Sequence, residues 1–468
     1  MKRAFYLIIF ISLIGILNEF ALCQPSNAIY ASSQTNGGSN GTIGSFDVAN
    51  PGNAINTVTN VEPNANYARL TASSTVGTAT AWLQLAFPGS VTGNSTVYIK
   101  TTATAVALLG GGVTIAAYTS ATGTGTAVAQ AYAAPKTYYT GDGNVYMAVT
   151  PTGNFQSIRI TLTSPVALGT NTFDVFYAFY GPTAGNDSNP FPFNVADCGL
   201  PNVSTTGSSG ITVGSFGVSS PGNAIDGDAS STASSFYATG LSILSGHIFQ
   251  TFFFNGTSNS ADAVRIVLAK NGAFTAVSLA GSIKVQGYNG ATAVGTSQLF
   301  SALLDVDLLN LLSTNNNKVT AYFAPKDASN NSVIFDRVTV DLDLGLLGVA
   351  LGSNGLSIFD IRRVPDVPVS PDLSVCSNIA TAALSALTVQ ESLSGIGTFT
   401  YKWYDTLRDG SLLNTGKNYS VSGLSTAGQV KNYYVDIQKS GCVTPSGRKK
   451  VNVSIINPPV SPGVALTP

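Results

Sequence analysis

The feature that most constrains this chain is an internal repeat. Residues 44–55 read GSFDVANPGNAI, and residues 214–225 read GSFGVSSPGNAI, at an offset of 170 residues. The same register also matches at Thr42 with Thr212 and at Tyr67-Ala68 with Tyr237-Ala238. Self-similarity at a fixed offset is the signature of a duplicated structural unit. We therefore predict two copies of one domain.

The composition indicates an all-β protein that is poor in charge. Charged residues make up 10% of the chain, against about 25% in an average soluble protein. The hydrophobic fraction of 44% is ordinary, and 48 glycines and many β-branched residues accompany it. The net charge is −1, and the only run of three basic residues is 448–450. A nucleic-acid partner normally leaves a basic patch, so none is expected.

The first 23 residues are typical of a secretory signal peptide. Lys2 and Arg3 precede an apolar run over residues 4–17, and Ala21-Leu22-Cys23 offers a cleavage site. Acylation of Cys23, as in a lipoprotein, is the alternative, although the bulky Leu22 disfavours it. No later run reaches the ~18 apolar residues that a membrane-spanning helix needs. The protein is expected to be secreted, extracellular or outer-surface associated, and not membrane-spanning.

Short β-branched or alternating runs separated by Gly, Asn, Pro and Thr clusters fill both copies. Many short strands of this kind predict sandwiches or barrels, and no segment shows a sustained helical period with caps. A length near 170 residues with about eight strands favours a jelly roll over a seven-stranded immunoglobulin domain. The copies are expected at residues 24–196 and 207–364. Residues 302–312 fit either a strand or one short helix.

A third domain follows a Pro/Val linker at residues 365–371, which is expected to be extended. We expect this domain to cover residues 372–456. The junction Val369-Ser370-Pro371 recurs as Val460-Ser461-Pro462. Residues 457–468 are therefore expected to lead into a possible further repeat, as part of a longer array.

The third domain carries the series YKWY (residues 401–404), LLNTG (412–416), YYV (433–435) and SGC (440–442). This series resembles the immunoglobulin-like domain found in tandem in secreted surface proteins of Bacteroidetes, of the gliding and adhesin-associated type. The resemblance implies a β-sandwich that serves spacing or adhesion. Trp403, in an alternating strand, is expected to be a central core residue. No C-terminal sorting domain of the kind such proteins carry is visible, which leaves the secretion route open.

Within this resemblance, Cys376 and Cys442 bracket the domain, and we predict a disulfide between them. An exported protein meets conditions in which disulfides persist. Two free buried thiols are the alternative. Cys198 is then left over in the linker, either as a free thiol or as an intermolecular partner.

The sequence Asp226-Gly227-Asp228 is similar to a loop of discoidin-like, galactose-binding-like modules that often lies beside a structural calcium ion. Closely spaced carboxylates and backbone carbonyls suit Ca²⁺, which takes six to eight oxygen ligands. The Trp that usually follows in that family is missing here, and the first copy has Asn56-Thr57-Val58 instead. The competing interpretation is a tight turn in which the Asp side chains bond their own backbone. No other cofactor is expected.

Catalysis is predicted to be absent. His247 is the only histidine, so one Ser-His pair is the most that the chain could form, and a multi-histidine metal site is not possible. Beyond the leader, Glu62 and Glu391 are the only glutamates, and they fall in different domains. No pair of carboxylates is placed for glycoside hydrolysis.

The sequence offers one candidate sugar platform, formed by Tyr138 and Tyr139 beside Asp142 and Asn144. Aromatic faces with polar partners suit sugars, but such loop aromatics also cover core edges. We therefore predict a secreted surface protein for adhesion or structural presentation, without catalytic activity. The alternative is a carbohydrate-binding protein that uses jelly-roll loops, possibly with calcium. The expected partners are surface glycans or neighbouring surface proteins.

Overall fold

The structure is a computed structural model. It describes residues 28–56, 65–102, 112–123, 125–132, 134–164, 167–181, 198–210, 212–243, 246–272, 275–304, 306–347, 351–388 and 398–459. The predicted signal peptide and the repeated junction at residues 460–462 lie outside these residues. The chain forms two compact units, the first comprising Met1–Tyr138 and Asn144–Ala196, the second Tyr139–Gly143 and Asp197–Pro468.

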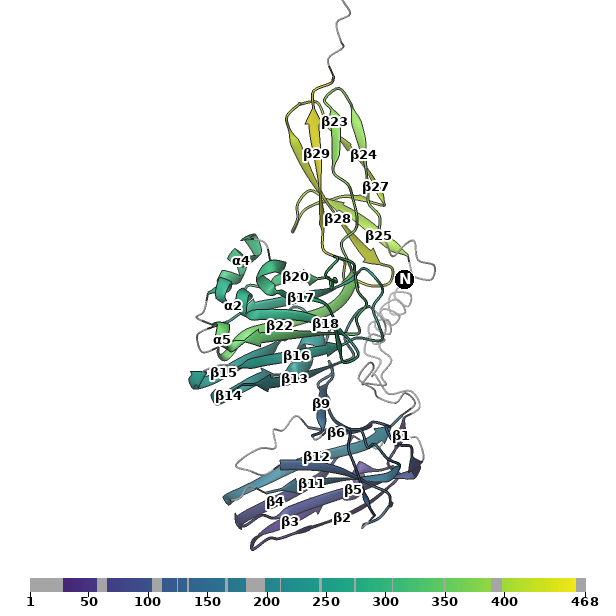
Figure 1. The fold of residues 1–468 in the computed structure, drawn as a ribbon, viewed down its shortest axis with the longest axis vertical. Coiled ribbons are helices and arrows are strands. Elements are labelled where there is room, and N and C mark those ends of the chain that lie inside the picture. The colour runs from purple at the N-terminus through teal and green to yellow at the C-terminus, as the bar shows by residue number, and fades with distance from the viewer. Residues whose placement is uncertain are drawn as a thin grey trace, which may run out of the picture. The chain divides into compact units, whose positions relative to one another are not determined.

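The first unit holds a β-sandwich (Figure 1). One layer runs in the order β3 (Ile43–Ala49), β4 (Ala68–Val76), β12 (Ala167–Tyr180), β6 (Val97–Thr101), β10 (Val145–Val149) and β9 (Lys136–Tyr139), with β1 (Ile29–Tyr30) on β12. The other runs β2 (Ser33–Ser39), β5 (Thr80–Val91), β11 (Phe155–Thr163), β7 (Gly112–Tyr118) and β8 (Ala127–Val128). From β4 to β7 successive strands alternate between the layers, as in a jelly roll.

The second unit contains a sandwich with the same strand order. One layer runs β14 (Thr212–Ser219), β15 (Ser234–Ile243), β22 (Gly352–Pro365), β17 (Asp262–Lys270) and β20 (Val319–Phe323). The other runs β13 (Val203–Ser209), β16 (His247–Phe253), β21 (Arg337–Asp343), β18 (Ile283–Asn289) and β19 (Thr292–Leu299). Strand for strand, this is the order β3-β4-β12-β6-β10 and β2-β5-β11-β7-β8 of the first sandwich. The repeated sequence therefore corresponds to a repeated topology.

The repeated motif forms the same turn in both sandwiches. Asn50 and Ser220 adopt left-handed backbone conformations, with φ of 52° and 48°. A 3-10 helix follows each, η1 (Pro51–Ala54) and η2 (Pro221–Ile225). Proline suits the first position of such a turn because it has no N–H to leave unpaired. The alanine of each turn, Ala54 or Ala224, is fully buried, so the motif anchors the turn to the core.

The second sandwich contains short helices, although the sequence shows no sustained helical period with caps. They are α2 (Ala276–Ser282), α3 (Phe300–Leu303), α4 (Val306–Ser313) and α5 (Leu344–Leu347), and α2, α4 and α5 gather at one end of the sandwich in Figure 1. Of the ambiguous segment 302–312, residues 302–303 end α3 and residues 306–312 lie in α4. None of these helices exceeds eight residues, which is too short to show a sustained period in the sequence. Thr275 caps α2 by accepting a hydrogen bond from the Ser278 N–H at 3.1 Å.

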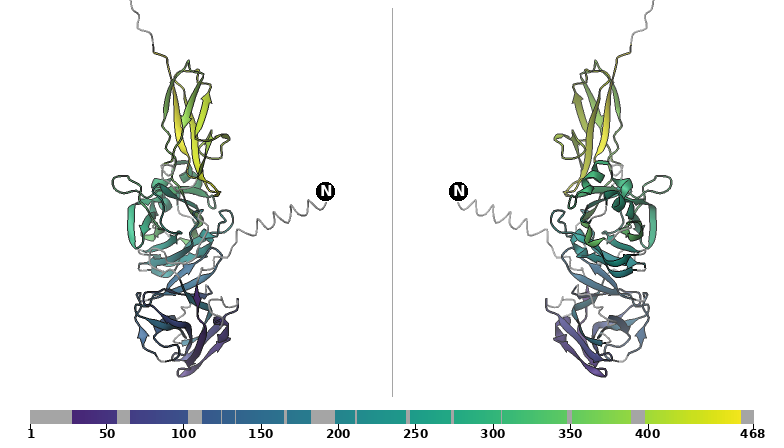
Figure 2. Two further views of the ribbon diagram at one scale, coloured as in Figure 1. Left: turned by 90° about the vertical axis from the view of Figure 1, so that its right-hand side faces the viewer. Right: turned by 90° about the vertical axis from the view of Figure 1, so that its left-hand side faces the viewer.

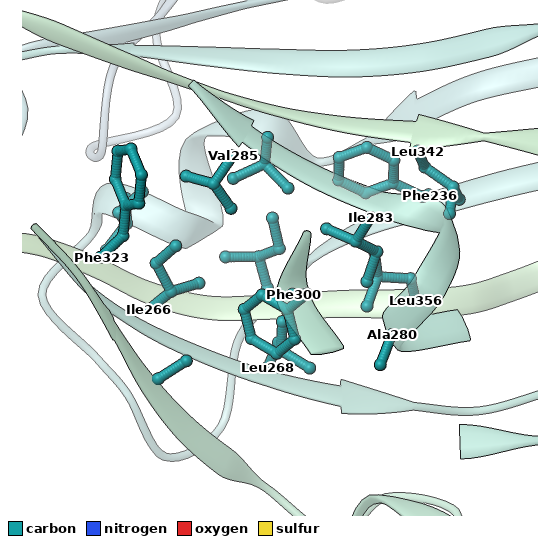
Figure 3. Close-up of a cluster of buried hydrophobic side chains, with 14 of the residues drawn as sticks. Phe236, Ile266, Leu268, Ala280, Ile283, Val285, Phe300, Phe323, Leu342 and Leu356 are labelled. Carbon is teal, nitrogen blue, oxygen red and sulfur yellow. The ribbon is translucent and has the colours of Figure 1, made fainter. Parts of the chain in front are cut away.

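The interior of the second sandwich is a continuous apolar core. The side views in Figure 2 show its sheets facing each other. Figure 3 shows side chains from both sheets and from the helices converging, among them Phe236, Ile266, Ala280, Phe300 and Leu342. Each of these five side chains is fully buried. Inward-facing residues alternate with outward-facing ones along β18, as the period of a strand requires.

The third domain is an immunoglobulin-like sandwich within the second unit. Its larger sheet runs β23 (Leu373–Cys376), β29 (Lys449–Ile456), β28 (Val430–Lys439), β25 (Phe399–Tyr404) and β26 (Leu412–Thr415). The smaller sheet pairs β24 (Thr381–Ser385) with β27 (Asn418–Ser422). Trp403 is fully buried and donates its indole N–H to the Gly416 carbonyl at 2.9 Å. The prediction that this residue lies in the centre of the core is confirmed.

The second sandwich should respond strongly to loss of core volume. Leu268→Ala removes a fully buried side chain from β17, and we expect it to lower the free energy of unfolding by about 2–5 kcal/mol. Leu299→Ala is the matched control, because that leucine is 45% exposed and should cost less than about 1 kcal/mol. Urea denaturation monitored by hydrogen exchange of β17 peptides measures both. Equal losses for the two variants would contradict this description of the core.

Candidate functional site

A disulfide joins the second sandwich to the immunoglobulin-like domain. Cys198 and Cys442 are bonded, with Cα atoms 5.2 Å apart and 244 residues apart in sequence. Cys198 precedes β13, and the neighbouring Gly199 carbonyl accepts a hydrogen bond from Arg363 N–H at 2.8 Å. Cys442 lies in the turn after β28, where its N–H donates to the Lys439 carbonyl at 3.1 Å. The bond therefore connects the start of the second sandwich to the turn between β28 and β29 of the third domain.

The predicted Cys376–Cys442 disulfide is wrong. Cys376 is a free thiol that ends β23, opposite Ile456, beside the start of β28. Cys442 follows the end of β28, a strand of 10 residues. At about 3.3 Å per residue the two cysteines lie roughly 30 Å apart, whereas a disulfide needs Cα atoms within about 7 Å. Cys198, which the sequence analysis left over, is the true partner.

The sequence contains a signal that would have identified this partner. Cys198 lies just before β13, the first strand of its sandwich, and Cys376 ends β23, the first strand of its domain. In the second sandwich the Gly199 carbonyl accepts a hydrogen bond from Arg363 N–H at 2.8 Å, so the start of the sandwich lies beside the end of its last strand, where the chain leaves for the next domain. A cysteine at the start of one domain is thus placed to meet a turn of the following one.

Polar and aromatic contacts surround the disulfide at this joint. Arg363 is buried and donates to the Gly256 carbonyl at 3.0 Å, and its Nε lies 3.9 Å from a carboxylate oxygen of Asp262. A cavity of about 30 Å³ beside Cys198 and Cys442 is lined by both of these side chains. That volume accommodates one or two water molecules, not a sugar. The joint is therefore a packed interface and not a ligand pocket.

On the immunoglobulin-like side, Arg448 organises a second cluster at the joint. Its guanidinium stacks on Tyr404, with Cζ 3.4 Å from the ring centroid, and its Nε lies 3.5 Å from Asp436 Oδ2. Burial raises the pKa of Asp436, and the charge of Arg448 opposes that rise. A Cβ at Gly447 would come within 3.2 Å of the Tyr322 ring of β20, so glycine permits this close approach.

The loop predicted to bind calcium directs its oxygens toward its own donors. Asp226 Oδ1 accepts from the Asp228 N–H at 2.8 Å, and Oδ2 accepts from the Thr232 hydroxyl. Asp228 accepts from the Ser230 N–H at 2.7 Å and from the hydroxyls of Ser230 and Ser231. These bonds have the form of a self-bonded Asp turn.

Side chains of the protein also occupy the carbonyl oxygens of this loop. Lys318 Nζ donates to the carbonyls of Ala229, at 2.9 Å, and Ser230, and Arg362 Nη2 donates to that of Gly227 at 3.0 Å. Among the described residues no group of three or more His, Cys, Asp or Glu side chains is placed to hold a metal. Calcium binding at Asp226 and Asp228 stays a prediction, and a bound ion would have to displace these cationic groups.

The fold buries one residue of the candidate sugar platform and leaves the other three at least partly exposed. Tyr138 is 4% exposed and packs against Tyr98, with ring centroids 6.4 Å apart. Tyr139 is half-buried, and burial raises its pKa. Asp142 lies exposed in the following turn, where it accepts from the Thr140 hydroxyl, and Asn144 is partly exposed. Sugar binding here stays a prediction, and only Tyr139, Asp142 and Asn144 have surface to offer.

The only histidine lies at the start of β16, on the outer face of its sheet. His247 Nδ1 is 3.1 Å from Asp341 Oδ1, and Ser209 is its cross-strand neighbour on β13. Burial raises the pKa of Asp341, while His247 lowers it. Within the part of the chain that the structure describes, no hydrogen bond joins the Ser209 hydroxyl to His247. Glu62 and Glu391 lie outside the described residues.

Comparison with known families identifies the third domain. Residues 365–458 match the family model described as Ig-like domain, CHU_C associated. The predicted immunoglobulin-like domain is thereby confirmed. No curated protein sequence matches the chain. Among the described residues no helix is long and apolar enough to cross a membrane.

Solved structures similar to this chain include two enzymes and an adhesin. The β-1,2-glucanase from Parabacteroides distasonis is 11% identical over 55% of this chain and 37% of its own, with a TM-score of 0.22. Allantoicase from Saccharomyces cerevisiae is 11% identical over 75% and 97%, with a TM-score of 0.22. The adhesin domain of Epf from Streptococcus pyogenes is 12% identical over 49% and 78%, with a TM-score of 0.18.

These likenesses correct the prediction that the chain is not an enzyme. Glycoside hydrolases and allantoicase stand among the similar structures. The chain spans only 37% of the glucanase. At these TM-scores the likenesses supply no argument for an activity. The prediction that the chain is not an enzyme therefore does not stand, and no activity is assigned.

Peptide mapping without reduction tests the disulfide. We expect proteolysis to yield the Cys198 peptide linked to the Cys442 peptide, with Cys376 alkylated by iodoacetamide before any reductant is added. Cys376→Ser should leave this link intact, whereas Cys198→Ser should free Cys442 for alkylation. Recovery of a Cys376–Cys442 peptide would restore the original prediction and refute the joint.

The Asp228 loop should titrate abnormally. Hydrogen bonds from Ser230 and Ser231 favour the ionised form and hold the pKa of the Asp228 carboxyl well below its usual range. The bonds therefore support the folded loop above about pH 4 and are lost as the pH falls through the lowered pKa. Carbon-detected NMR titration of the carboxyl checks this. Ser231→Ala should raise the midpoint, while Ser329→Ala, in another Asp turn, should leave it unchanged.

Proposed function

We propose that this chain is an extracellular surface protein of the adhesin type, in which the second sandwich and the immunoglobulin-like domain form a covalently locked stalk. The family match at residues 365–458, the low charge and the predicted export signal support a surface location. We further propose that the sandwiches are of the galactose-binding-like type, for which the Asp226-Gly227-Asp228 loop is the sequence evidence.

The observation that carries this proposal is the position of the disulfide in the chain. Cys198 stands at the entrance of the second sandwich, and Cys442 stands near the end of the immunoglobulin-like domain. A force that pulls on the two ends of the chain passes from Cys198 directly to Cys442. The intervening strands, β13 to β28, lie inside the closed loop and carry no end-to-end tension.

Such shielding suits a protein that holds one surface against another. Strands that pull apart under load expose unpaired edges, which are prone to wrong pairing. A stalk whose largest part cannot be extended keeps its length and its fold while its ends are loaded. The close approach of Gly447 to the Tyr322 ring of β20 adds stiffness where the two domains meet.

Single-molecule stretching tests the load path. The loop encloses 244 residues, and at about 3.4 Å per residue its release adds roughly 80 nm to the contour length at full extension. We expect the oxidised chain to lack this extension and Cys198→Ser, or the reduced chain, to gain it. Cys376→Ser is the matched control and should extend like the unaltered chain. Equal contour lengths before and after reduction would refute the shielded stalk.

Adhesion itself is tested with beads that carry the chain in a flow chamber lined with glycans or matrix proteins. We expect retention above albumin-coated beads on at least one lining. Reduction should preserve capture at rest and lower the shear at which beads detach, because only the stalk is weakened. Retention equal to albumin on every lining would reject the adhesin function, even where the stretching result holds.

A further inference from the structure

One arginine on the first sandwich has no carboxylate partner among the described residues. Seven other described arginines have a guanidinium nitrogen within 3.9 Å of an aspartate oxygen: Arg69, Arg265, Arg337, Arg362, Arg363, Arg408 and Arg448. The exception is Arg159, in β11. It is also the only charged residue in the five strands of its sheet, β2, β5, β11, β7 and β8. An arginine in this state can pair with a carboxylate that comes from outside the chain.

Arg159 lies between two aromatic rings on the outer face of its sheet. Its Cζ is 4.2 Å from the ring centroid of Trp82 on β5 and 4.9 Å from that of Tyr118 on β7. Their neighbours Leu83 and Ile160 are fully buried in the core, so the alternation of a strand directs Trp82 and Arg159 outward. All three outward side chains are partly exposed. We call Trp82, Tyr118 and Arg159 the Arg159 platform.

Buried polar groups hold the guanidinium in a fixed position. Gln84 is fully buried, and its Oε1 accepts from Arg159 Nε at 3.0 Å and from Nη2 at 2.6 Å. Nη2 also donates to the Gly123 carbonyl in the loop after β7. Gln84 Nε2 donates in turn to the Ser157 hydroxyl at 2.7 Å. The two N–H groups of Nη1 have no acceptor within the part of the chain that the structure describes, so a preorganised pair of donors remains for a ligand.

The second sandwich shows the same sheet with the same arrangement of glycine and aromatic ring. Gly37 of β2 lies opposite Trp82, and Gly207, 170 residues later, lies opposite Phe249. A Cβ at Gly37 would come within 2.6 Å of the indole, and one at Gly207 would come within 2.3 Å of the phenyl ring. Each glycine therefore lets the ring lie against its strand, and the two outer faces can be compared position by position.

The comparison shows that the fold does not require this arginine. Arg159 corresponds to Thr339, whose hydroxyl shares a hydrogen bond of 2.8 Å with that of Thr251. Thr161, two residues after Arg159, corresponds to Asp341. The same topology therefore forms with a threonine pair at this position. An arginine that the fold does not need, held rigidly with two donors left over, points to a ligand.

The surroundings favour an acidic sugar over an acidic peptide. β5 and β11 are paired with strands on both sides, so the platform has no strand edge to which a peptide backbone could pair. It offers a guanidinium for a carboxylate, aromatic rings for the apolar C–H groups of a sugar, and the neighbouring hydroxyls of Thr114 and Thr161 for sugar hydroxyls.

We propose that the Arg159 platform binds a uronic acid unit of an acidic polysaccharide, whose carboxylate accepts the two N–H groups of Arg159 Nη1. The proposal rests on the proposed adhesin function, to which it adds a ligand class. The absence of any acidic residue from the described strands of this sheet means that a polyanion meets no repulsion there.

Affinity electrophoresis of the full chain tests this, in gels that contain polygalacturonate, alginate or neutral dextran. We expect at least one of the two acidic polysaccharides to retard the chain, and dextran to leave its migration unchanged. Arg159→Gln should weaken the binding about tenfold or more, as loss of a charge-assisted pair does. Lys450→Gln removes the same charge from an exposed position in β29 and should leave the binding unchanged.

A second variant keeps Arg159 and its hydrogen bonds in place. Thr161→Asp copies the aspartate that the second sandwich carries at this position, so the fold should tolerate it in a thermal melt. Its charge should weaken the binding several-fold by repelling the uronate.

Retardation by neither acidic polysaccharide would overturn the site, as would a folded Arg159→Gln or Thr161→Asp variant that binds like the unaltered chain. In that case bead retention on another lining would leave the adhesin function standing. Binding in the gels without bead retention would reject adhesion and leave the Arg159 platform standing.

Discussion

The burial of apolar side chains between two β-sheet layers is the interaction on which this molecule depends. With charged residues at 10%, the chain has few ion pairs to use, and its sandwiches are held by interiors such as the one around Phe236 and Phe300. The repeated turn also packs into these interiors, because its alanine, Ala54 or Ala224, is fully buried. Duplication preserved the core and the strand order, while the surface loops diverged.

The Cys198–Cys442 bond converts two separately packed domains into one mechanical element. Hydrophobic cores resist thermal unfolding, but a pulling force concentrates on whichever strands connect the loaded ends. By diverting that force, one covalent bond protects every strand from β13 to β28. The close approach of Gly447 to the Tyr322 ring has a different task, which is to restrict the angle between the bonded domains.

Sequence reasoning identified the elements that local patterns encode. The alternation of apolar residues predicted the strands, the repeat predicted equal topologies, and Trp403 was correctly placed in a core. It failed at the disulfide, because cysteine pairing depends on which strand ends meet in space. Cys376 and Cys442 lie on either side of the domain in sequence, but the length of β28 separates them in the fold. It left open whether Tyr138 formed a sugar platform or covered a core edge, and the structure buries its ring beside Tyr98.

Each sandwich also has its entrance beside its exit. Ala31 donates its N–H to the Ala178 carbonyl at 3.0 Å, and Arg363 donates to Gly199 at 2.8 Å. A domain whose two ends lie close together can be inserted, duplicated or deleted without disturbing the folds of its neighbours. Evolution can therefore treat such a sandwich as a cassette, and lineages that carry it are free to vary the number of copies.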